Sequence, residues 1–331
     1  MACSPCPSTR PNLSAFNYPF RLTPDQTSAP ADTPKPGPSN LQLRTIYGLL
    51  GAALLVGSVW FSPWTFGLFF AFVQAVMLWE FYRMMRAGGY APATWLGMGV
   101  SLLLFATILF DNTLHVSSSD FAFKLKRYSE VVMLGCGLLL PTVLLIRAML
   151  NWSGKEQHDI SFANVGVTLL GVFYVGLPMS LLSIIAYPSN PDFSREFHGY
   201  DYRRVIVLLF LIWSSDIGAY AAGKTFGKHK LAPKISPGKT WEGFAGGVVL
   251  TLAMGWALGY LIPELPLAHR LVAAGVVAVF GPLGDLAESM LKRSVGVKDS
   301  GRIMPGHGGL LDRFDAFLLV LPVLVLLQLL F

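Results

Sequence analysis

Apolar segments of about twenty residues recur along almost the whole chain, and they constrain the fold more than any other feature. Each is close to the roughly 20 residues that a helix needs to cross the hydrocarbon core of a bilayer. The pattern predicts an all-α, polytopic integral membrane protein. About nine transmembrane helices are expected, at residues 45–62, 64–84, 93–110, 131–150, 162–187, 204–222, 243–262, 268–290 and 314–331. Because only Ser62-Pro63-Trp64 separates the first two segments, a kink or an interfacial hairpin is an alternative there.

The composition supports a lipid environment. Hydrophobic residues make up 53% of the chain and charged residues 13%, about half the roughly 25% that is usual for soluble domains. A water-soluble body is therefore excluded. The net charge of +6 favours anionic lipid and phosphate over nucleic acid as partners, because the aromatic residues lie in apolar runs and not among the bases. Cys3, Cys6 and Cys136 are too few for a disulfide framework, and nothing nearby completes a zinc site with Cys3 and Cys6.

Three regions are predicted along the chain. Residues 1–42 are rich in Pro, Ser, Thr and Asn and are expected to form a disordered cytoplasmic tail, not a cleaved signal peptide. Residues 43–200 form the N-terminal transmembrane helices. Residues 201–331 form the C-terminal catalytic helices, because intramembrane charges concentrate there. One predicted side of the membrane holds 18 of the 25 lysines and arginines, which places the N-terminus and the polar loops of the last third in the cytoplasm.

Asp216 interrupts the apolar segment 204–222. An ionised carboxylate is costly in hydrocarbon, so such a residue usually faces a polar cavity; an interfacial aspartate paired with Lys224 is the alternative. The adjoining Gly218–Thr225, GAYAAGKT, fits the pattern of a P-loop. A P-loop joins a strand to a helix, whereas this stretch begins inside a predicted membrane helix. We therefore reject a nucleotide-binding P-loop here.

The loop that follows carries five lysines before its first acid, Glu242. Lysines bind phosphate as point charges, although an ordinary cytoplasmic loop would also be lysine-rich. Ser236-Pro237-Gly238-Lys239-Thr240 is expected to be a shaped turn, since Pro and Gly restrict the backbone beside phosphate-binding side chains. A triphosphate is a natural ligand for this turn.

The densest group of polar residues lies near the end of the chain. On a helix, Glu288, Ser289 and Lys292 follow Asp285 at i+3, i+4 and i+7 and therefore share one face. Asp312 and Asp315 project together from the first turn of the last segment and are expected to face Asp285. These carboxylates are suitable ligands for Mg²⁺. The alternative is that Asp312 and Asp315 only complement the helix dipole.

The remaining polar residues of this region have less specific roles. Four bases are expected to balance phosphate charge: Arg293, Lys298, Arg302 and Arg313. His307 lies between glycines, where acid–base catalysis, a phosphate contact and a simple turn position are all open. Glu80 and Arg83, at the end of the second segment, are expected to form an interfacial ion pair, with a role in the cavity as the alternative.

The stretch Ser289–Asp315, SMLKRSVGVKDSGRIMPGHGGLLDRFD, closely resembles the signature segment of the phosphatidate cytidylyltransferases, or CDP-diacylglycerol synthases. It contains the S-x-x-K-R, K-D, H-G-G and D-R-x-D elements. S-D-x-x-A-Y at Ser215–Tyr220 and S-P-x-K-T-x-E-G at Ser236–Gly243 are similar to other motifs of the family. The resemblance covers about the last third of the chain, and Met304 departs from it, where a branched residue or phenylalanine is expected.

The resemblance implies a membrane enzyme in which the phosphate of phosphatidate attacks the α-phosphorus of CTP and expels pyrophosphate. It implies Mg²⁺ as cofactor, with K⁺ as a candidate second cation, held by Asp285 and Asp312. The predicted catalytic residues are Asp285, Asp312, Lys292, Arg293 and His307. The predicted substrate-binding residues are Asp216, Ser236, Lys239, Thr240, Glu242, Ser289, Lys298 and Arg313. The predicted metal ligands are Asp285, Asp312, Glu288 and Asp315.

The expected partners are CTP, phosphatidic acid and the bilayer, without nucleic acid, and a homodimer is a candidate assembly. The expected location is a bacterial inner membrane, with the active site on the cytoplasmic side. Two other functions fit parts of the pattern. One is a secondary transporter, since intramembrane carboxylates also mark ion pathways. The other is a cytidylyl- or phosphotransferase acting on a different lipid phosphate.

Overall fold

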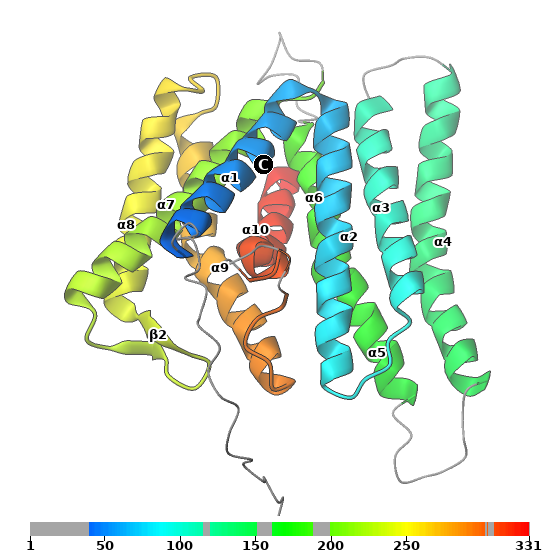
Figure 1. Cartoon of the computed structure of the whole chain (residues 1–331). Helices are drawn as coiled ribbons and strands as arrows, with labels where there is room; N and C mark the ends of the chain where they lie inside the picture. The colour runs from blue at the N-terminus through cyan, green and yellow to red at the C-terminus, as the bar shows by residue number, and fades with distance from the viewer. Residues whose placement is uncertain are drawn as a thin grey trace, which may run out of the picture. The chain divides into compact units, whose positions relative to one another are not determined.

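The computed structural model describes residues 40–114, 120–150, 161–187, 199–301, 303 and 308–330, which are almost entirely helical (Figure 1). The predicted tail lies almost wholly outside these residues, as do Cys3, Cys6, Arg302, Met304 and His307. The elements are α1 (Asn40–Phe61), α2 (Pro63–Ala87), α3 (Thr94–Leu114), α4 (Asp120–Leu150), α5 (Ser161–Gly171), the π-helical turn η1 (Val172–Gly176), α6 (Leu177–Ala186), α7 (Tyr202–Phe226), β1 (Lys230–Ala232), β2 (Ser236–Thr240), α8 (Trp241–Ala257), the 3₁₀ turn η3 (Leu258–Tyr260), α9 (Leu267–Ser294) and α10 (Leu311–Leu330).

Each predicted apolar segment overlaps a helix in the described part of the chain, with ends that differ by a few residues. Within the described ranges, seven helical segments are long and apolar enough to cross a membrane: Pro63–Ala87, Thr94–Thr113, Tyr128–Leu150, Phe162–Ala186, Tyr202–Phe226, Trp241–Tyr260 and Leu267–Ser294. The all-α, polytopic class is therefore confirmed. The count of nine is not, because Tyr47–Phe61 is a shorter apolar helix and α10 begins with Asp312, Arg313 and Asp315.

The junction between α1 and α2 is a helix cap. The Ser62 hydroxyl accepts hydrogen bonds from the backbone N–H groups of Trp64 and Thr65, both at 3.2 Å, and the Thr65 hydroxyl accepts one from the Ser62 N–H at 3.1 Å. This reciprocal arrangement satisfies donors that a helix start leaves unpaired. Pro63 occupies the first helical position, where no N–H is needed. The chain therefore ends one helix and starts another instead of kinking a single one.

Helices α7 and α8 pack backbone to backbone through small residues. A methyl group added at Gly218 would lie 2.6 Å from the carbonyl oxygen of Gly246, and one at Gly247 would lie 3.0 Å from that of Ser215. Small residues let membrane helices approach this closely. The whole GAYAAGKT stretch lies within α7, in helical conformation. This confirms that the stretch does not form a P-loop and explains its glycines by helix packing.

A two-stranded hairpin is the one non-helical element in the described part of the chain, and it lies below α7 and α8 in Figure 1. Strands β1 and β2 pair antiparallel. The prediction of a turn at Ser236–Thr240 is wrong: these residues form β2, and the chain reverses at 233–235. Pro237 is tolerated because both strands of such a hairpin are edge strands. The Thr240 hydroxyl then accepts a hydrogen bond from the Gly243 N–H at 3.1 Å and caps α8.

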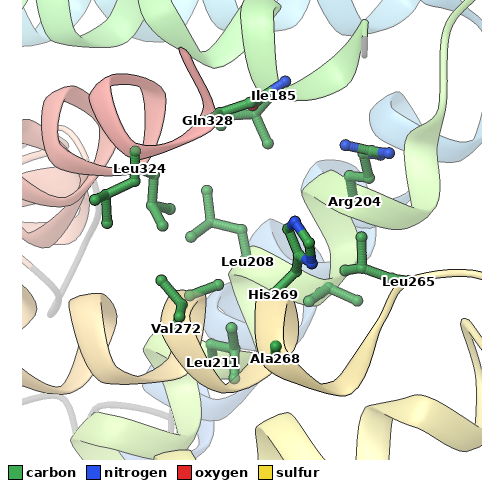
Figure 2. A pocket seen from close by; sticks show the side chains of 13 residues that line it. Ile185, Arg204, Leu208, Leu211, Leu265, Ala268, His269, Val272, Leu324 and Gln328 are labelled. Atoms are coloured by element: carbon green, nitrogen blue, oxygen red, sulfur yellow. The ribbon is translucent and has the colours of Figure 1, made fainter. Parts of the chain in front are cut away.

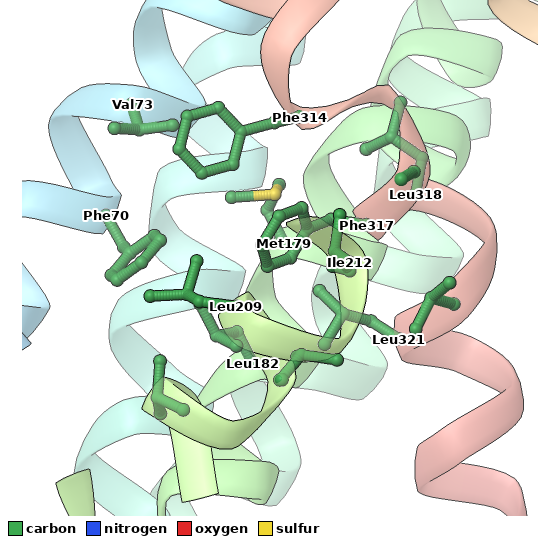
Figure 3. Close-up of a cluster of buried hydrophobic side chains, with 14 of the residues drawn as sticks. Phe70, Val73, Met179, Leu182, Leu209, Ile212, Phe314, Phe317, Leu318 and Leu321 are labelled. Carbon is green, nitrogen blue, oxygen red and sulfur yellow. The ribbon is translucent and has the colours of Figure 1, made fainter. Parts of the chain in front are cut away.

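The main hydrophobic core joins α2, α6, α7 and α10 (Figure 3). The rings of Phe70 on α2 and Phe314 on α10 meet edge to face, with centroids 6.3 Å apart. Phe317 and Leu321 of α10 are also fully enclosed by this core. Lipid is as apolar as these side chains, so tight packing and not removal from water holds the helices together. The packing anchors α10 and thereby positions its first turn, which carries Asp312 and Asp315.

The close approach of α7 and α8 leads to a stability prediction. Gly218→Ala is expected to destabilise the protein by about 1–3 kcal/mol, because the new methyl group must push the two helices apart. Gly275→Ala in α9 is the matched control, since nothing lies within 4 Å of the added methyl; helix propensity alone then stabilises the protein by up to about 1 kcal/mol. Thermal unfolding in detergent measures both. Equal midpoints for the two variants would contradict the packing argument.

Candidate functional site

Three carboxylates from two helices gather at one place. Asp285 and Glu288 lie on α9 and Asp315 lies on α10, and each offers an oxygen within 4.8 Å of the other two. The helices can approach here because Gly284 has no side chain: a methyl group there would lie 2.6 Å from the Asp315 carbonyl oxygen. The predicted facing of Asp315 and Asp285 is therefore confirmed.

A lysine from the hairpin completes this side of the site. Lys239 Nζ lies 2.7 Å from Asp285 Oδ2 and donates a hydrogen bond to the Pro282 carbonyl oxygen at 3.2 Å. Asp216 of α7 interacts electrostatically with Asp285, Lys239 and Arg313, so it belongs to the same cluster. Its alternative partner, Lys224, lies instead over the ring of Tyr220, 5.6 Å from the centroid. Among the described ion pairs none joins Asp216 to Lys224, and the charged groups that act on Asp216 are those of the site.

Lys292 connects the two helices from the other side. Its Nζ lies 2.6 Å from Glu288 Oε2 and 2.7 Å from Asp312 Oδ1. Asp312 also accepts hydrogen bonds from the Gly309 N–H at 2.8 Å and from the Ser300 N–H at 3.3 Å. Asp312 is thus tied to Lys292 and to the backbone that precedes α10, while Asp315 joins the group of three carboxylates. The assignment of Asp312 as a metal ligand stays a prediction.

The chemistry of the three carboxylates suits a hard divalent cation. Mg²⁺ prefers oxygen ligands and commonly takes a few carboxylates together with substrate phosphates. Glu288 is 1% exposed, and its Oε1 is buried without a hydrogen-bond partner among the described residues. A buried acceptor of this kind normally has a partner. Asp285, Glu288 and Asp315 therefore fit a bound Mg²⁺.

The other predicted site residues have varied surroundings. The Ser289 hydroxyl donates to Asp285 Oδ1 at 3.2 Å, at the centre of the site. Glu242 accepts hydrogen bonds from the backbone N–H groups of Lys228 and His229 and lies 2.6 Å from His229 Nδ1, so it holds the start of the hairpin. Ser236 lies in β2, and Thr240 caps α8. Three bases are exposed, namely Arg293, Lys298 and Arg313; His307 lies outside the described residues.

Two contributions come from the N-terminal helices: the sequence held a role in the cavity for Glu80 and Arg83 only as the alternative, and it did not single out Tyr174. The expected interfacial ion pair of Glu80 and Arg83 is wrong: Glu80 is fully buried and accepts a hydrogen bond from the Leu311 N–H at 2.8 Å, while Arg83 donates to the Ser300 carbonyl oxygen at 2.9 Å. Tyr174, in the π-helical turn η1, interacts electrostatically with the three clustered carboxylates. Such π-helical turns often occur at functional sites.

An apolar pocket of about 450 Å³ lies elsewhere in the bundle (Figure 2). Leucine, valine and alanine side chains of α7, α9 and α10 line most of it, and Arg204 and His269 also lie at it. The last α9 residue that lines the pocket is Ala273. It precedes Asp285 by twelve residues, which places the two about 18 Å apart along the helix. The pocket is therefore separate from the carboxylate cluster.

Helices long and apolar enough to cross a membrane, with paired carboxylates and lysines between them, define a polytopic membrane protein with a charged cluster among its helices. The sequence profile of the cytidylyltransferase family matches residues 42–331. The chain belongs to this family. A phosphatidate cytidylyltransferase of Bacillus subtilis (strain 168) is 34% identical over 294 residues, which span 88% of this chain and 99% of that protein. Those of Staphylococcus haemolyticus (strain JCSC1435) and Staphylococcus aureus (strain COL) are both 39% identical over 180 residues, 54% of this chain and 65% of each relative.

The ion pairs of Lys292 lead to a second stability prediction. Lys292→Met is expected to destabilise the protein by about 3–5 kcal/mol, because it leaves the carboxylates of Glu288 and Asp312 enclosed without their cation. Lys234→Met, at the exposed turn of the hairpin, is the control and should change stability by less than about 0.5 kcal/mol. Thermal unfolding in detergent compares the two. Similar midpoints would show that Lys292 does not hold α9 and α10 together.

Proposed function

We propose that this chain is a phosphatidate cytidylyltransferase, which converts CTP and phosphatidate into CDP-diacylglycerol and pyrophosphate in phospholipid biosynthesis. The observation that carries the proposal is the meeting of Asp285, Glu288 and Asp315 with Lys239 and Lys292. This cluster lies between membrane helices, within the region that the family profile matches. The match to nearly the full length of the Bacillus subtilis relative supports the same activity.

The reaction joins two anions, so the site must offset their mutual repulsion. A phosphate oxygen of phosphatidate attacks the α-phosphorus of CTP, and the bond from that phosphorus to the pyrophosphate oxygen breaks. Mg²⁺ held by Asp285, Glu288 and Asp315, with Asp312 as a further ligand and K⁺ as a candidate second cation, would neutralise phosphate charge. Lys239 supplies a positive charge from the hairpin beside Asp285. Positioning and charge stabilisation together account for most catalysis of this type.

The arrangement also suits one water-soluble and one membrane-embedded substrate. Lys239 and Ser236 lie on β2, outside the helical bundle, where a nucleoside triphosphate can reach them. Asp216 and Asp285 lie on helices long and apolar enough to cross a membrane, and Asp315 lies on α10, which packs against α9. A lipid phosphate can therefore approach from the bilayer while CTP approaches from the hairpin side, which the distribution of lysine and arginine places in the cytoplasm.

The activity is tested directly with the purified protein in detergent. Labelled CTP, phosphatidate and Mg²⁺ should yield CDP-diacylglycerol, and EDTA should stop the reaction. Asp285→Asn, Asp312→Asn and Asp315→Asn should each lower kcat/KM by about 100-fold or more, because each removes a carboxylate charge from the site. Glu264→Gln, whose carboxylate pairs with Arg203 outside the site, should keep full activity.

Three results would contradict the proposal. If the wild-type protein made product only with another nucleotide or another lipid phosphate, the substrates would be wrong. If Asp285→Asn and Asp312→Asn kept full activity, the metal site would be wrong. Transport of a solute into vesicles, without any labelled lipid product, would favour a secondary transporter.

The proposed orientation is tested by labelling cysteines in intact cells. In a chain whose Cys3, Cys6 and Cys136 are replaced by serine, Lys234→Cys in the hairpin should react with a membrane-impermeant maleimide only after the cells are opened. Residue 264 follows α8, so it lies on the other side of the membrane from the hairpin if α8 crosses the membrane. Glu264→Cys should therefore react with the maleimide in intact cells. The reverse result would place the hairpin outside the cytoplasm.

A further inference from the structure

Glu80 is a fully buried carboxylate that the proposed reaction does not use. It lies on α2, far in sequence from the motifs of the last third of the chain. Its Oε2 accepts hydrogen bonds from the Leu311 N–H at 2.8 Å and from the Ser300 hydroxyl at 3.3 Å. Its Oε1 is buried without a hydrogen-bond partner among the described residues. A carboxylate is costly in the interior of a membrane protein, so its presence there points to a function.

Two glycines close around this carboxylate. A methyl group added at Gly301 would lie 2.6 Å from Glu80 Cδ, and one added at Gly309 would lie 2.6 Å from Glu80 Oε2. Any other residue at either position would therefore displace Glu80 or the backbone beside it. Gly301 and Gly309 therefore leave the space that the Glu80 side chain occupies.

Glu80 contacts Ser300 and Leu311, which lie next to the groups that position Asp312. The Ser300 N–H and the Gly309 N–H both donate to Asp312, and Leu311 begins the helix on which Asp312 lies. Arg83, one turn after Glu80, adds a hydrogen bond to the Ser300 carbonyl oxygen at 2.9 Å. Helix α2 thus contacts both the first residue of α10 and Ser300.

We propose that Glu80 is a positioning residue for the reaction. It anchors the N-terminus of α10 and Ser300, and through them it fixes Asp312 relative to Lys292 and the carboxylates of α9. Negative charge is also favourable at a helix N-terminus, where N–H groups lack helical partners. This inference rests on the proposed function, because it assigns the anchored residues to that reaction.

The test compares Glu80→Ala with Gln74→Ala in the full-length protein in detergent. Gln74 is an equally buried polar residue of α2 whose side chain donates to the Ser101 carbonyl oxygen, away from α10. Glu80→Ala should lower kcat about 10- to 100-fold and raise the Mg²⁺ concentration for half-maximal rate. The KM for CTP should change much less. Gln74→Ala should keep kcat and the Mg²⁺ requirement, with a comparable loss of thermal stability.

Hydrogen exchange supplies a readout that does not depend on activity. The Leu311 amide should exchange at least about tenfold faster in Glu80→Ala than in the wild type, and at the wild-type rate in Gln74→Ala. Glu80→Gln keeps the shape but offers a weaker neutral acceptor, so it should give smaller changes in the same direction. If Glu80→Ala does not fold, Glu80→Gln alone tests the positioning role.

The outcomes separate the two proposals. Wild-type kcat and exchange in both Glu80 variants would overturn the positioning role. Losses of kcat in Glu80→Ala and Gln74→Ala that simply follow their losses of stability would also overturn it. If the wild-type protein makes no CDP-diacylglycerol, the proposed function fails, whereas the exchange of Leu311 still tests the anchoring by Glu80.

Discussion

Charges placed between membrane helices must find their partners inside the protein, and this constraint organises the site. Lys292 joins Glu288 to Asp312, and Lys239 reaches Asp285 from the hairpin. The pair of Lys292 with Asp312 links α9 to α10, and the pair of Lys239 with Asp285 links the hairpin to α9, so the compensation of charge also holds these elements in place. An isolated carboxylate would be costly here, whereas a connected group with satisfied hydrogen bonds is tolerated.

Local patterns were enough to predict much of this arrangement. The length of an apolar run is a local property, so the helical segments were found correctly, and helical periodicity correctly placed Glu288, Ser289 and Lys292 on the face of Asp285. The hairpin was missed because both strands are short and β2 contains proline and glycine, which indicate turns. The different partners of Asp312 and Asp315 depend on Gly284 and on the backbone before α10, which no spacing rule describes.

The N-terminal helices do more than support the bundle. The motifs that resemble the family lie in the last third of the chain, so the sequence directed attention there, although the family profile also matches the N-terminal helices from residue 42 onward. Glu80, Arg83 and Tyr174 nevertheless reach the site or the backbone that shapes it. These contacts join residues more than a hundred positions apart, so they cannot be inferred from a single sequence. Their shared signal was a charged or polar side chain within an apolar segment.

The residues in the first two turns of α10 have two different roles. Asp312 and Asp315 lie at the carboxylate and lysine site, while Phe314 and Phe317, whose ring centroids are 5.2 Å apart, pack into the core. A substitution that loosens either ring shifts the same backbone that carries the carboxylates. A substitution in these two turns therefore changes thermostability and turnover together. An engineer who selects variants for heat resistance at these positions is also selecting, without choosing to, among different catalytic rates.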